Sequence, residues 1–366
     1  MKLPWQKYTA HDNSSEEEKR VLQGYSLYVF KKYLFIIICI VATILIAGLS
    51  ISIGIGGISI IRAYEILIEH VQGNIVNEIE DYIIWGVRLP PLLGGLIAGA
   101  GLAITGAVMQ STLKNPLADP YTTGISSGAS FGATLSIVMG INIIGVGNQY
   151  GIVLNAFLFS LIPMFAIMIV SSMRRASATT IILAGIAVMY MFNAMTTIMM
   201  LRADPVALAD AYSWQVGTLS LIKMKDLPIM FGFVLVGGVS LMLLSSKINI
   251  LSAGDESAKS LGVNADTLRI VCLLIVSMMA AAIVSFTGII GFVGLVCPHI
   301  CRMVIGSDNR YLLPASAMFG AMFLILANLI GNNIIAPTTL QVGVITAFLG
   351  APVLIFLLIK LKKETW

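Results

Sequence analysis

Residues 88–132 read RLPPLLGGLIAGAGLAITGAVMQSTLKNPLADPYTTGISSGASFG, and this stretch decides the fold. Two apolar segments rich in glycine and alanine flank the hexapeptide NPLADP. Pro116 and Pro120 cannot lie inside an unbroken helix. Asn115 and Asp119 add polar groups at the membrane edge. The stretch therefore predicts two membrane helices hinged by a polar turn, which is typical of a helix bundle around a pathway rather than of a passive anchor.

Small residues recur in the second of these helices. Gly124, Gly128 and Gly132 are four residues apart, which places them on one helix face where a neighbouring backbone can approach closely. We expect this face to be a helix-packing surface. Asn115 and Asp119 are candidate pathway or gate residues that could contact substrate, and capping of the helix ends at the break is the favoured alternative.

The composition places the whole chain in the membrane class. Of its 366 residues, 58% are hydrophobic and only 11% are charged, whereas a soluble protein carries about 25% charged residues. The sequence therefore predicts an all-α polytopic membrane protein. We see no signal peptide. The basic residues are scattered across loops, so the net charge of +4 gives no indication of a nucleic-acid partner.

Ten segments approach the length of about 20 apolar residues that a membrane-spanning helix needs. The predicted spans are 33–54, 86–110, 123–144, 151–172, 181–201, 228–246, 270–289, 291–305, 313–331 and 342–359. An even number of spans places both termini on one side of the membrane. That side holds 17 of the 22 Lys and Arg residues and the other side holds 5, so both termini are expected to be cytoplasmic.

Two segments outside the spans precede the quoted stretch. Residues 1–32 form a polar cytoplasmic segment in which Ser15 and Glu18 have the spacing of a capping box. We expect a short amphipathic helix lying on the membrane over residues 14–32. Residues 62–82 are acidic and external.

A third segment, 247–269, is cytoplasmic and has a helix-forming composition. Asp255 and Glu256 favour a helix start, and Gly262 favours its end with a positive φ. Asn264 is then a candidate cap for the helix that follows. This pattern predicts two helices joined by a tight stop.

The sequence lacks the motifs of several kinds of catalytic site. The dipeptide Gly-Lys never occurs, so the chain cannot hydrolyse ATP by a P-loop. No metalloprotease motif, nucleophile elbow or metal-spaced cysteine set is present, and we expect no enzymatic activity, cofactor or resident metal. None of the predicted spans has an Asp or Glu in its interior, although ion-driven transporters carry ionisable groups there. The energy for transport is therefore expected to come from a partner.

The sequence C-P-H-x-C at Cys297, His299 and Cys301 suggests a metal site at first sight. The two cysteines share a helix face, but a residue two positions along points elsewhere. Free cysteines also tend to be buried as small apolar residues, so we favour a structural role.

Four motifs occur in order along the chain. They are RLP to GxSSGAxxGA over 88–133, A-x-x-LG over 258–262, GxIGFVGLVxPHxxR over 288–302 and VGVxTAxLGAPxxxxLL over 342–358. With these motifs the chain resembles the FecCD family of ABC-transporter permeases, which import vitamin B12, iron-siderophores and haem. The resemblance covers almost all of residues 33–361.

The resemblance implies a ten-helix permease domain over 33–361 with the type II ABC importer fold, which forms a homodimer with a central pathway in the plasma membrane. Two cytoplasmic ATP-binding-cassette ATPase subunits and an external substrate-binding protein would complete the transporter. Segment 247–269 would couple the permease to the ATPase. Its coupling residues would be Asp255, Ala258, Leu261 and Gly262, of which Ala258 and Leu261 would present small and apolar surface.

The resemblance also suggests roles in the pathway and at the external face. The fifth span lines the pathway in the family, and Met195 and Met199 lie on one of its faces, where flexible thioethers suit a bulky cargo. Ordinary helix packing is the alternative. The family usually reads RLPR where this chain has RLPP, so docking of the binding protein would depend on Arg88 with fewer cations.

An iron-siderophore complex is the first expectation for the cargo, and haem, a corrinoid or an oxyanion remain open. The alternative function is an ion-coupled secondary transporter or channel that works without an ATPase. The missing intramembrane carboxylates argue against ion coupling, and segment 247–269 argues for an ATPase partner.

Overall fold

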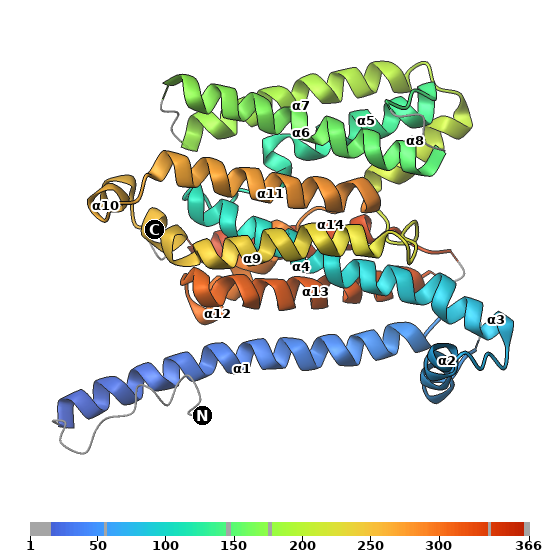
Figure 1. The fold of residues 1–366 in the computed structure, drawn as a ribbon, viewed down its shortest axis with the longest axis horizontal. Coiled ribbons are helices and arrows are strands. Elements are labelled where there is room, and N and C mark those ends of the chain that lie inside the picture. The colour runs from blue at the N-terminus through green and yellow to red at the C-terminus, as the bar shows by residue number, and fades with distance from the viewer. Residues whose placement is uncertain (1–15, 55–56, 144–147, 175–177, 336–337, 362–366) are drawn as a thin grey trace.

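The computed structural model describes residues 16–54, 57–143, 148–174, 178–335 and 338–361, which form helices and connecting loops without a strand (Figure 1). The helices are α1 (Glu16–Ser52), α2 (Ile60–Gln72), α3 (Glu78–Asp81), the π-helix η2 (Tyr82–Arg88), α4 (Leu89–Thr112), the 3₁₀ turn η3 (Pro120–Thr123), α5 (Ile125–Met139), α6 (Asn148–Arg174), α7 (Ala178–Met200), α8 (Pro205–Val216), α9 (Leu227–Ser252), α10 (Asp255–Ser260), α11 (Ala265–Thr287), α12 (Val293–Ile305), α13 (Asn309–Asn333) and α14 (Val342–Leu361).

Seven stretches of helix in the described part of the chain are long and apolar enough to cross a membrane. They lie in α1, α3 to α4, α6, α7, α9, α11 and α13. Three shorter apolar helices, α5, α12 and α14, occupy the remaining predicted spans. The chain is thus an all-helical, multi-pass membrane protein. The number of complete crossings stays a prediction.

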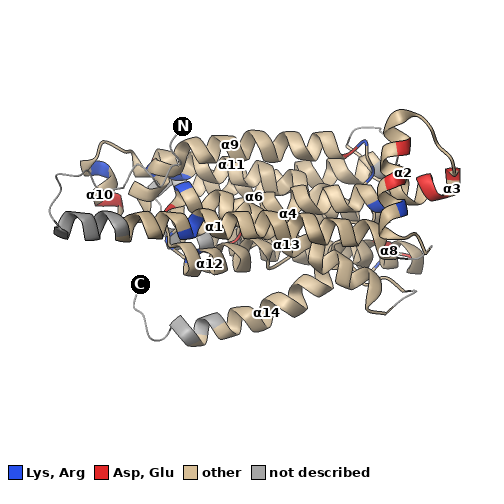
Figure 2. Ribbon diagram, turned by 90° about the horizontal axis from the view of Figure 1, so that it is seen from below, with Lys and Arg blue, Asp and Glu red and all other residues tan. Residues whose placement is uncertain are grey.

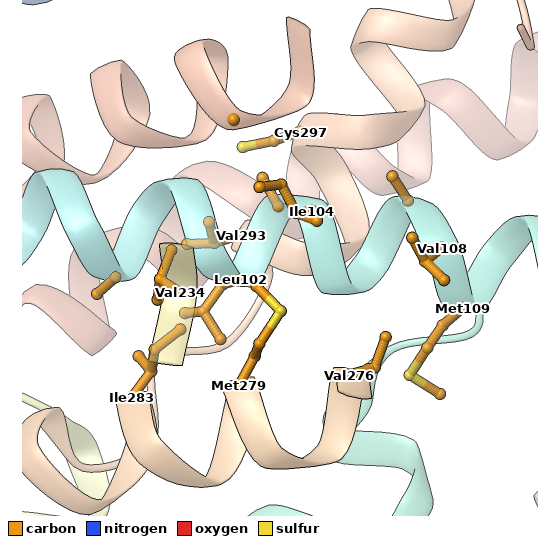
Figure 3. Close-up of a cluster of buried hydrophobic side chains, with 14 of the residues drawn as sticks. Leu102, Ile104, Val108, Met109, Val234, Val276, Met279, Ile283, Val293 and Cys297 are labelled. Atoms are coloured by element: carbon orange, nitrogen blue, oxygen red, sulfur yellow. The ribbon is translucent and has the colours of Figure 1, made fainter. Parts of the chain in front are cut away.

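Helix α4 lies in the centre of the bundle and packs against α9, α11, α12 and α13. Glycines allow two of these contacts to form between backbones. A Cβ on Gly99 would overlap the carbonyl group of Gly320 in α13, and one on Gly106 would overlap that of Gly294 in α12. Figure 3 shows apolar side chains of this core, among them Leu102, Val234, Met279 and Val293.

The two ends of the bundle carry different segments (Figure 2). Helix α10, the start of α1 and the end of α14 lie at one end, which we call the inner end. Helices α2, α3 and α8 lie at the opposite, outer end. The start of α1, the end of α14 and α10 of segment 247–269 thus lie at one end of the bundle, and the placement of the termini in the cytoplasm stays a prediction.

The N-terminal segment does not form a separate helix on the membrane, so that prediction was wrong. Helix α1 runs without a break from Glu16 to Ser52, and Ser15 lies outside the described residues. The basic residue Lys32 is only 3% exposed, because its ammonium group lies over the rings of Tyr28 and Tyr311 at 4.2 and 4.3 Å. These cation–π contacts stabilise the buried ammonium group, so the helix can continue without a break through this basic part of the sequence.

Other differences concern the external connections. Residues 62–82, expected only to be acidic, contain α2 and α3. Helix α8 was not predicted. It starts where the carboxylate of Asp204 accepts hydrogen bonds from the backbone N–H groups of Val206 and Ala207, with Pro205 at the first helical position. Helix α5 begins at Ile125 and ends at Met139, and it is shorter than predicted.

Candidate functional site

The short helix α10 at the inner end ends in the predicted tight stop. Gly262 has a φ of +74°, and the N–H of Val263 donates to the carbonyl of Ala258 at 2.8 Å. The side chain of Asn264 then caps α11 by accepting from the N–H of Thr267 at 3.1 Å. Asp255 and Glu256 occupy the first turn of α10, where negative charge is favourable.

The two apolar residues of this segment have opposite environments. Leu261 is 65% exposed, so it presents an apolar surface to the solvent at the inner end. Ala258 is fully buried, and the expectation that it also presents surface was wrong. Its small side chain lets α10 lie flat against the bundle. A partner that contacts this segment would therefore meet Leu261 and the surrounding polar groups.

An ionic cluster ties α10 to two spans. The carboxylate of Asp255 accepts hydrogen bonds from Lys114 at 2.9 Å and from Arg269 at 3.0 Å. Arg269, whose side chain is 5% exposed, also pairs with Asp266 at 3.3 Å and donates to the carbonyl of Thr112. The hydrogen bond from Lys114 is the main reason that the pKa of Asp255 lies below its usual value.

A second polar network starts from the last two turns of α4. It connects spans through hydrogen bonds between side chains rather than through ion pairs. Arg302 of α12 donates to the side chain of Gln110 at 3.1 Å. The hydroxyl of Ser111 donates to Asn309 at 3.0 Å, and Asn309 in turn donates to Asn249 at 2.8 Å. The ends of α4, α9, α12 and α13 are therefore joined by side chains as well as by packing.

Both polar residues of the NPLADP turn make the local bonds that capping requires. The side chain of Asn115 accepts from the N–H of Leu117 at 2.9 Å, and that of Asp119 accepts from the N–H of Tyr121 at 2.8 Å. Asp119 is 4% exposed, and its carboxylate lies beside Gly294 in the first turn of α12. These contacts favour capping, and a role as pathway or gate residues stays a prediction.

The three glycines of the predicted packing face do not all belong to one helix. Gly128 and Gly132 lie against the α6 backbone, where an added Cβ would overlap the carbonyls of Phe159 and Asn155. Gly124 precedes α5, has a φ of +85° and lies closest to Gly185 of α7. The expectation of one continuous glycine face was wrong at this position, because the left-handed residue ends the helical register.

Met195 and Met199 also have different surroundings. Met195 is 40% exposed, whereas Met199 is 7% exposed and packs with Phe131 and Phe192. The packing alternative therefore applies to Met199, and a role of either residue in the pathway stays a prediction. The large apolar residues that are exposed on α7 are Leu183, Tyr190, Met191, Met195 and Ile198, and Asn193 and Thr197 are exposed between them.

Helix α14 has an exposed apolar face as well. Phe348 is 80% exposed, and it lines an open groove of about 620 Å³ together with Val344, Ala351 and Pro352. Gly343 and Val216 border the same groove, and a Cβ on Gly343 would overlap the carbonyl of Val216 at the end of α8.

At the outer end, Arg88 faces the end of α1. Its guanidinium donates hydrogen bonds to the backbone carbonyls of Ile51 and Ser52, the latter at 3.0 Å. A cation near the carbonyl end of a helix is favourable, so the Arg88 side chain stabilises the end of α1. Its role in docking the binding protein stays a prediction.

Cys297, His299 and Cys301 are all buried in α12. In the described part of the chain, no three His, Cys, Asp or Glu side chains are close enough to hold a metal ion. The thiols lie near Cys39 of α1 and the hydroxyl of Ser316 in α13, and these contacts are compatible with the structural role.

Comparison with known proteins gives a consistent result. A family model described as the FecCD transport family matches residues 39–360. A chain of Methanocaldococcus jannaschii assigned as an ABC transporter permease is 38% identical over 349 residues, which cover 93% of this chain and 99% of that chain. The cobalamin import system permease of Halobacterium salinarum is 37% identical, with coverages of 77% and 75%. The hemin transport system permease of Yersinia pestis is 34% identical, with coverages of 77% and 84%.

One solved structure is similar over almost its full length. It is an inward-facing ABC transporter assigned to the metal-chelate type, and it matches with a TM-score of 0.78 at 27% sequence identity. The match covers 89% of this chain and 98% of that chain.

Proposed function

Because the chain belongs to the FecCD transport family, we propose that it is the permease through which an ATP-driven importer moves an iron-siderophore or a similar metal chelate. Relatives named for cobalamin and hemin support this cargo class, since both are large metal-centred molecules. The chain itself is a transport subunit of the ABC importer class. ATP hydrolysis takes place on a separate partner.

The attachment of α10 to the bundle is the observation that supports its role in energy coupling. This helix lies at the inner end and exposes Leu261. Its Asp255 pairs with Lys114, just beyond the end of α4, and with Arg269 of α11. A force applied to α10 by an ATPase subunit therefore reaches two spans directly. We assign the role of coupling segment to residues 247–269 on this basis.

A homodimer accounts for the uncovered faces of α7 and α14. Large apolar side chains such as Met195 and Phe348 are exposed on them, and the two helices lie at edges of the bundle, α7 in Figure 1 and α14 in Figure 2. Pairing of two copies through these helices would enclose a central pathway with an apolar, adaptable wall. The cargo would enter this pathway from an external binding protein.

The proposed orientation places α10 and both chain ends in the cytoplasm and α2, α3 and α8 outside a plasma membrane. The excess of Lys and Arg on the side of the termini, 17 against 5, supports it. The binding protein would then dock on the outer end, close to Arg88.

Reconstitution of the permease with its ATPase subunits and binding protein in liposomes tests the proposal. We expect uptake of a radiolabelled iron-siderophore that requires ATP and the binding protein, with hemin and cobalamin as competitors. Uptake by the permease alone under a proton or sodium gradient would instead support a secondary transporter. Uptake of the iron-siderophore that neither hemin nor cobalamin reduces would assign the cargo to the iron-siderophore.

A further inference from the structure

Two apolar grooves open on the outside of the bundle where α6, α9 and α11 meet. The first, of about 410 Å³, lies between α9 and α11 and reaches from Ile229 to Ser240. The second, of about 380 Å³, is bordered by α6 and extends to Tyr150. Ile229 and Phe233 line both, so the grooves meet at the outer part of α9. Each has the size of a typical ligand site.

The grooves lie along membrane-spanning helices, and a glycine near the start of α9 lines the first of them. A Cβ on Gly232 would meet no atom within 4 Å, so the space beside this residue is open to a ligand. The ring of Phe233 is 5.6 Å from that of Phe157, and this aromatic pair stands beside the second groove. The walls are otherwise almost wholly apolar, which suits a hydrocarbon chain.

A cation stands at the outer mouth of the second groove. The ammonium group of Lys225 lies 4.7 Å above the ring of Tyr150, and the side chain is exposed. The nearby carboxylate of Asp226 is buried, and it accepts hydrogen bonds from the N–H of Lys223 and the hydroxyl of Tyr150. The exposed ammonium group of Lys225 is therefore the cation at this mouth, while the carboxylate of Asp226 is hydrogen-bonded inside the protein.

We propose that this site binds one phospholipid molecule. The phosphate of its headgroup pairs with Lys225, and its two acyl chains lie in the two grooves on either side of Phe233. Two apolar channels that join below one exposed cation match a ligand with one anionic group and two hydrocarbon chains. The occupant is a lipid because the grooves face outward within the hydrocarbon region. The site lies at the outer end, and its assignment to the external leaflet depends on the proposed orientation.

Native mass spectrometry of the purified permease with dioleoyl phosphatidylglycerol tests this site. We expect one tightly bound lipid per chain. Gly232→Phe fills the first groove and should abolish this bound lipid, while Leu235→Phe, a change at an exposed position on the same helix outside the grooves, should leave it. Lys225→Gln should weaken binding about fivefold, the size expected for one lysine near an anionic headgroup, and Arg202→Gln should not.

A thermal-shift titration with the same lipid gives a second readout that does not depend on survival in the mass spectrometer. The melting temperature of the wild type and of both control variants should rise with lipid and saturate. A rise of equal size and midpoint in Lys225→Gln would overturn the headgroup assignment. Equal lipid occupancy in Gly232→Phe and Leu235→Phe would overturn the site. If Gly232→Phe does not fold, Lys225→Gln against Arg202→Gln still decides the outcome.

Discussion

The inner and outer ends of the bundle both carry clusters of ion pairs, but they connect different things. At the outer end, Arg62 pairs with Glu65, Glu69 and Glu80, all within 18 residues. His70 pairs there with Asp81 at 2.7 Å and stacks on Trp85, with the ring centroids 4.0 Å apart.

At the inner end, Lys114 pairs with Asp255 across 141 residues, and Arg302 bonds to Gln110 across 192. The outer cluster therefore shapes one local unit, α2 with α3, whereas the inner cluster joins separate spans to each other. Removing an ion pair at the outer end should affect only its own segment. Removing one at the inner end should change how the spans move together.

The largest contrast is expected between Arg269→Ala and Arg62→Ala. Each change removes an arginine that pairs with more than one carboxylate. Arg269→Ala should lower transport per ATP hydrolysed by about tenfold or more and destabilise the fold by about 1–3 kcal/mol, since a buried donor to charged partners is lost. Arg62→Ala should leave the transport ratio unchanged. Parallel uptake and ATPase assays in liposomes measure the transport ratio of each variant. An equal loss of this ratio in the two variants would contradict the comparison.

Two helix-ending glycines provide a second matched pair. Gly262 has a φ of +74° and Gly73 at the end of α2 has +75°, and an added Cβ would meet no atom within 4 Å at either position. Valine should therefore cost a similar strain of about 1–2 kcal/mol at both. Gly262→Val should reduce coupled transport several-fold, because it displaces α10, while Gly73→Val should not. Transport by Gly262→Val at the wild-type rate would remove α10 from the coupling mechanism.

Hydrogen exchange should show how far each cluster reaches. In Arg62→Ala, faster amide exchange is expected only within residues 60–81. In Arg269→Ala, it should extend to the inner ends of α4 and α11 together with α10. Mass spectrometry of peptic peptides after exchange in detergent distinguishes the two patterns. Exchange that stays within α10 in the second variant would mean that the spans do not depend on this arginine.

The smallest effect is expected from mild acid. Lys114 and Arg269 hold the pKa of Asp255 below its usual value, which is about 3.9 for an unperturbed aspartate. The stabilisation that the folded state gains from ionised Asp255 is therefore fully present above that value and is lost only as the pH falls through the lower, folded-state pKa. The stability difference between wild type and Asp255→Asn should stay constant from pH 7 to about pH 5. A decline over this range would show that the carboxylate is not held ionised.

Features that depend on backbone chemistry were predictable from the sequence. Pro116 and Pro120 required a break, and Gly262 required a helix end, because a missing N–H or a positive φ acts locally. The order of the apolar helices also followed from their composition. The resemblance over residues 33–361 supplied the family and its function class, which no single residue could have given.

Features that depend on contacts between residues far apart in the sequence were not predictable. Met199 is buried because Phe131 and Phe192 from other parts of the chain lie beside it, and Ala258 is buried because α10 lies flat. The dipeptide Asp204-Pro205 is a local signal for the start of α8, because Asp favours the cap and Pro the first helical position. The continuity of α1 through Lys32 depends on Tyr311, nearly 280 residues later in the chain.

The contact between Lys32 and Tyr311 can form only late in translation, because Tyr311 is made long after Lys32. Besides Lys32, Tyr33 meets the ring of Tyr311 at 5.8 Å, and Phe35 stacks on Phe319 at 6.2 Å. Helix α1 is synthesised long before its main packing partner, α13. Until α13 is made, α1 can contact lipid and the helices that follow it directly, such as α2 and the start of α4, but lacks most of its packing. Its apolar side chains, exposed around most of the helix, let it reside in the bilayer until α13 arrives.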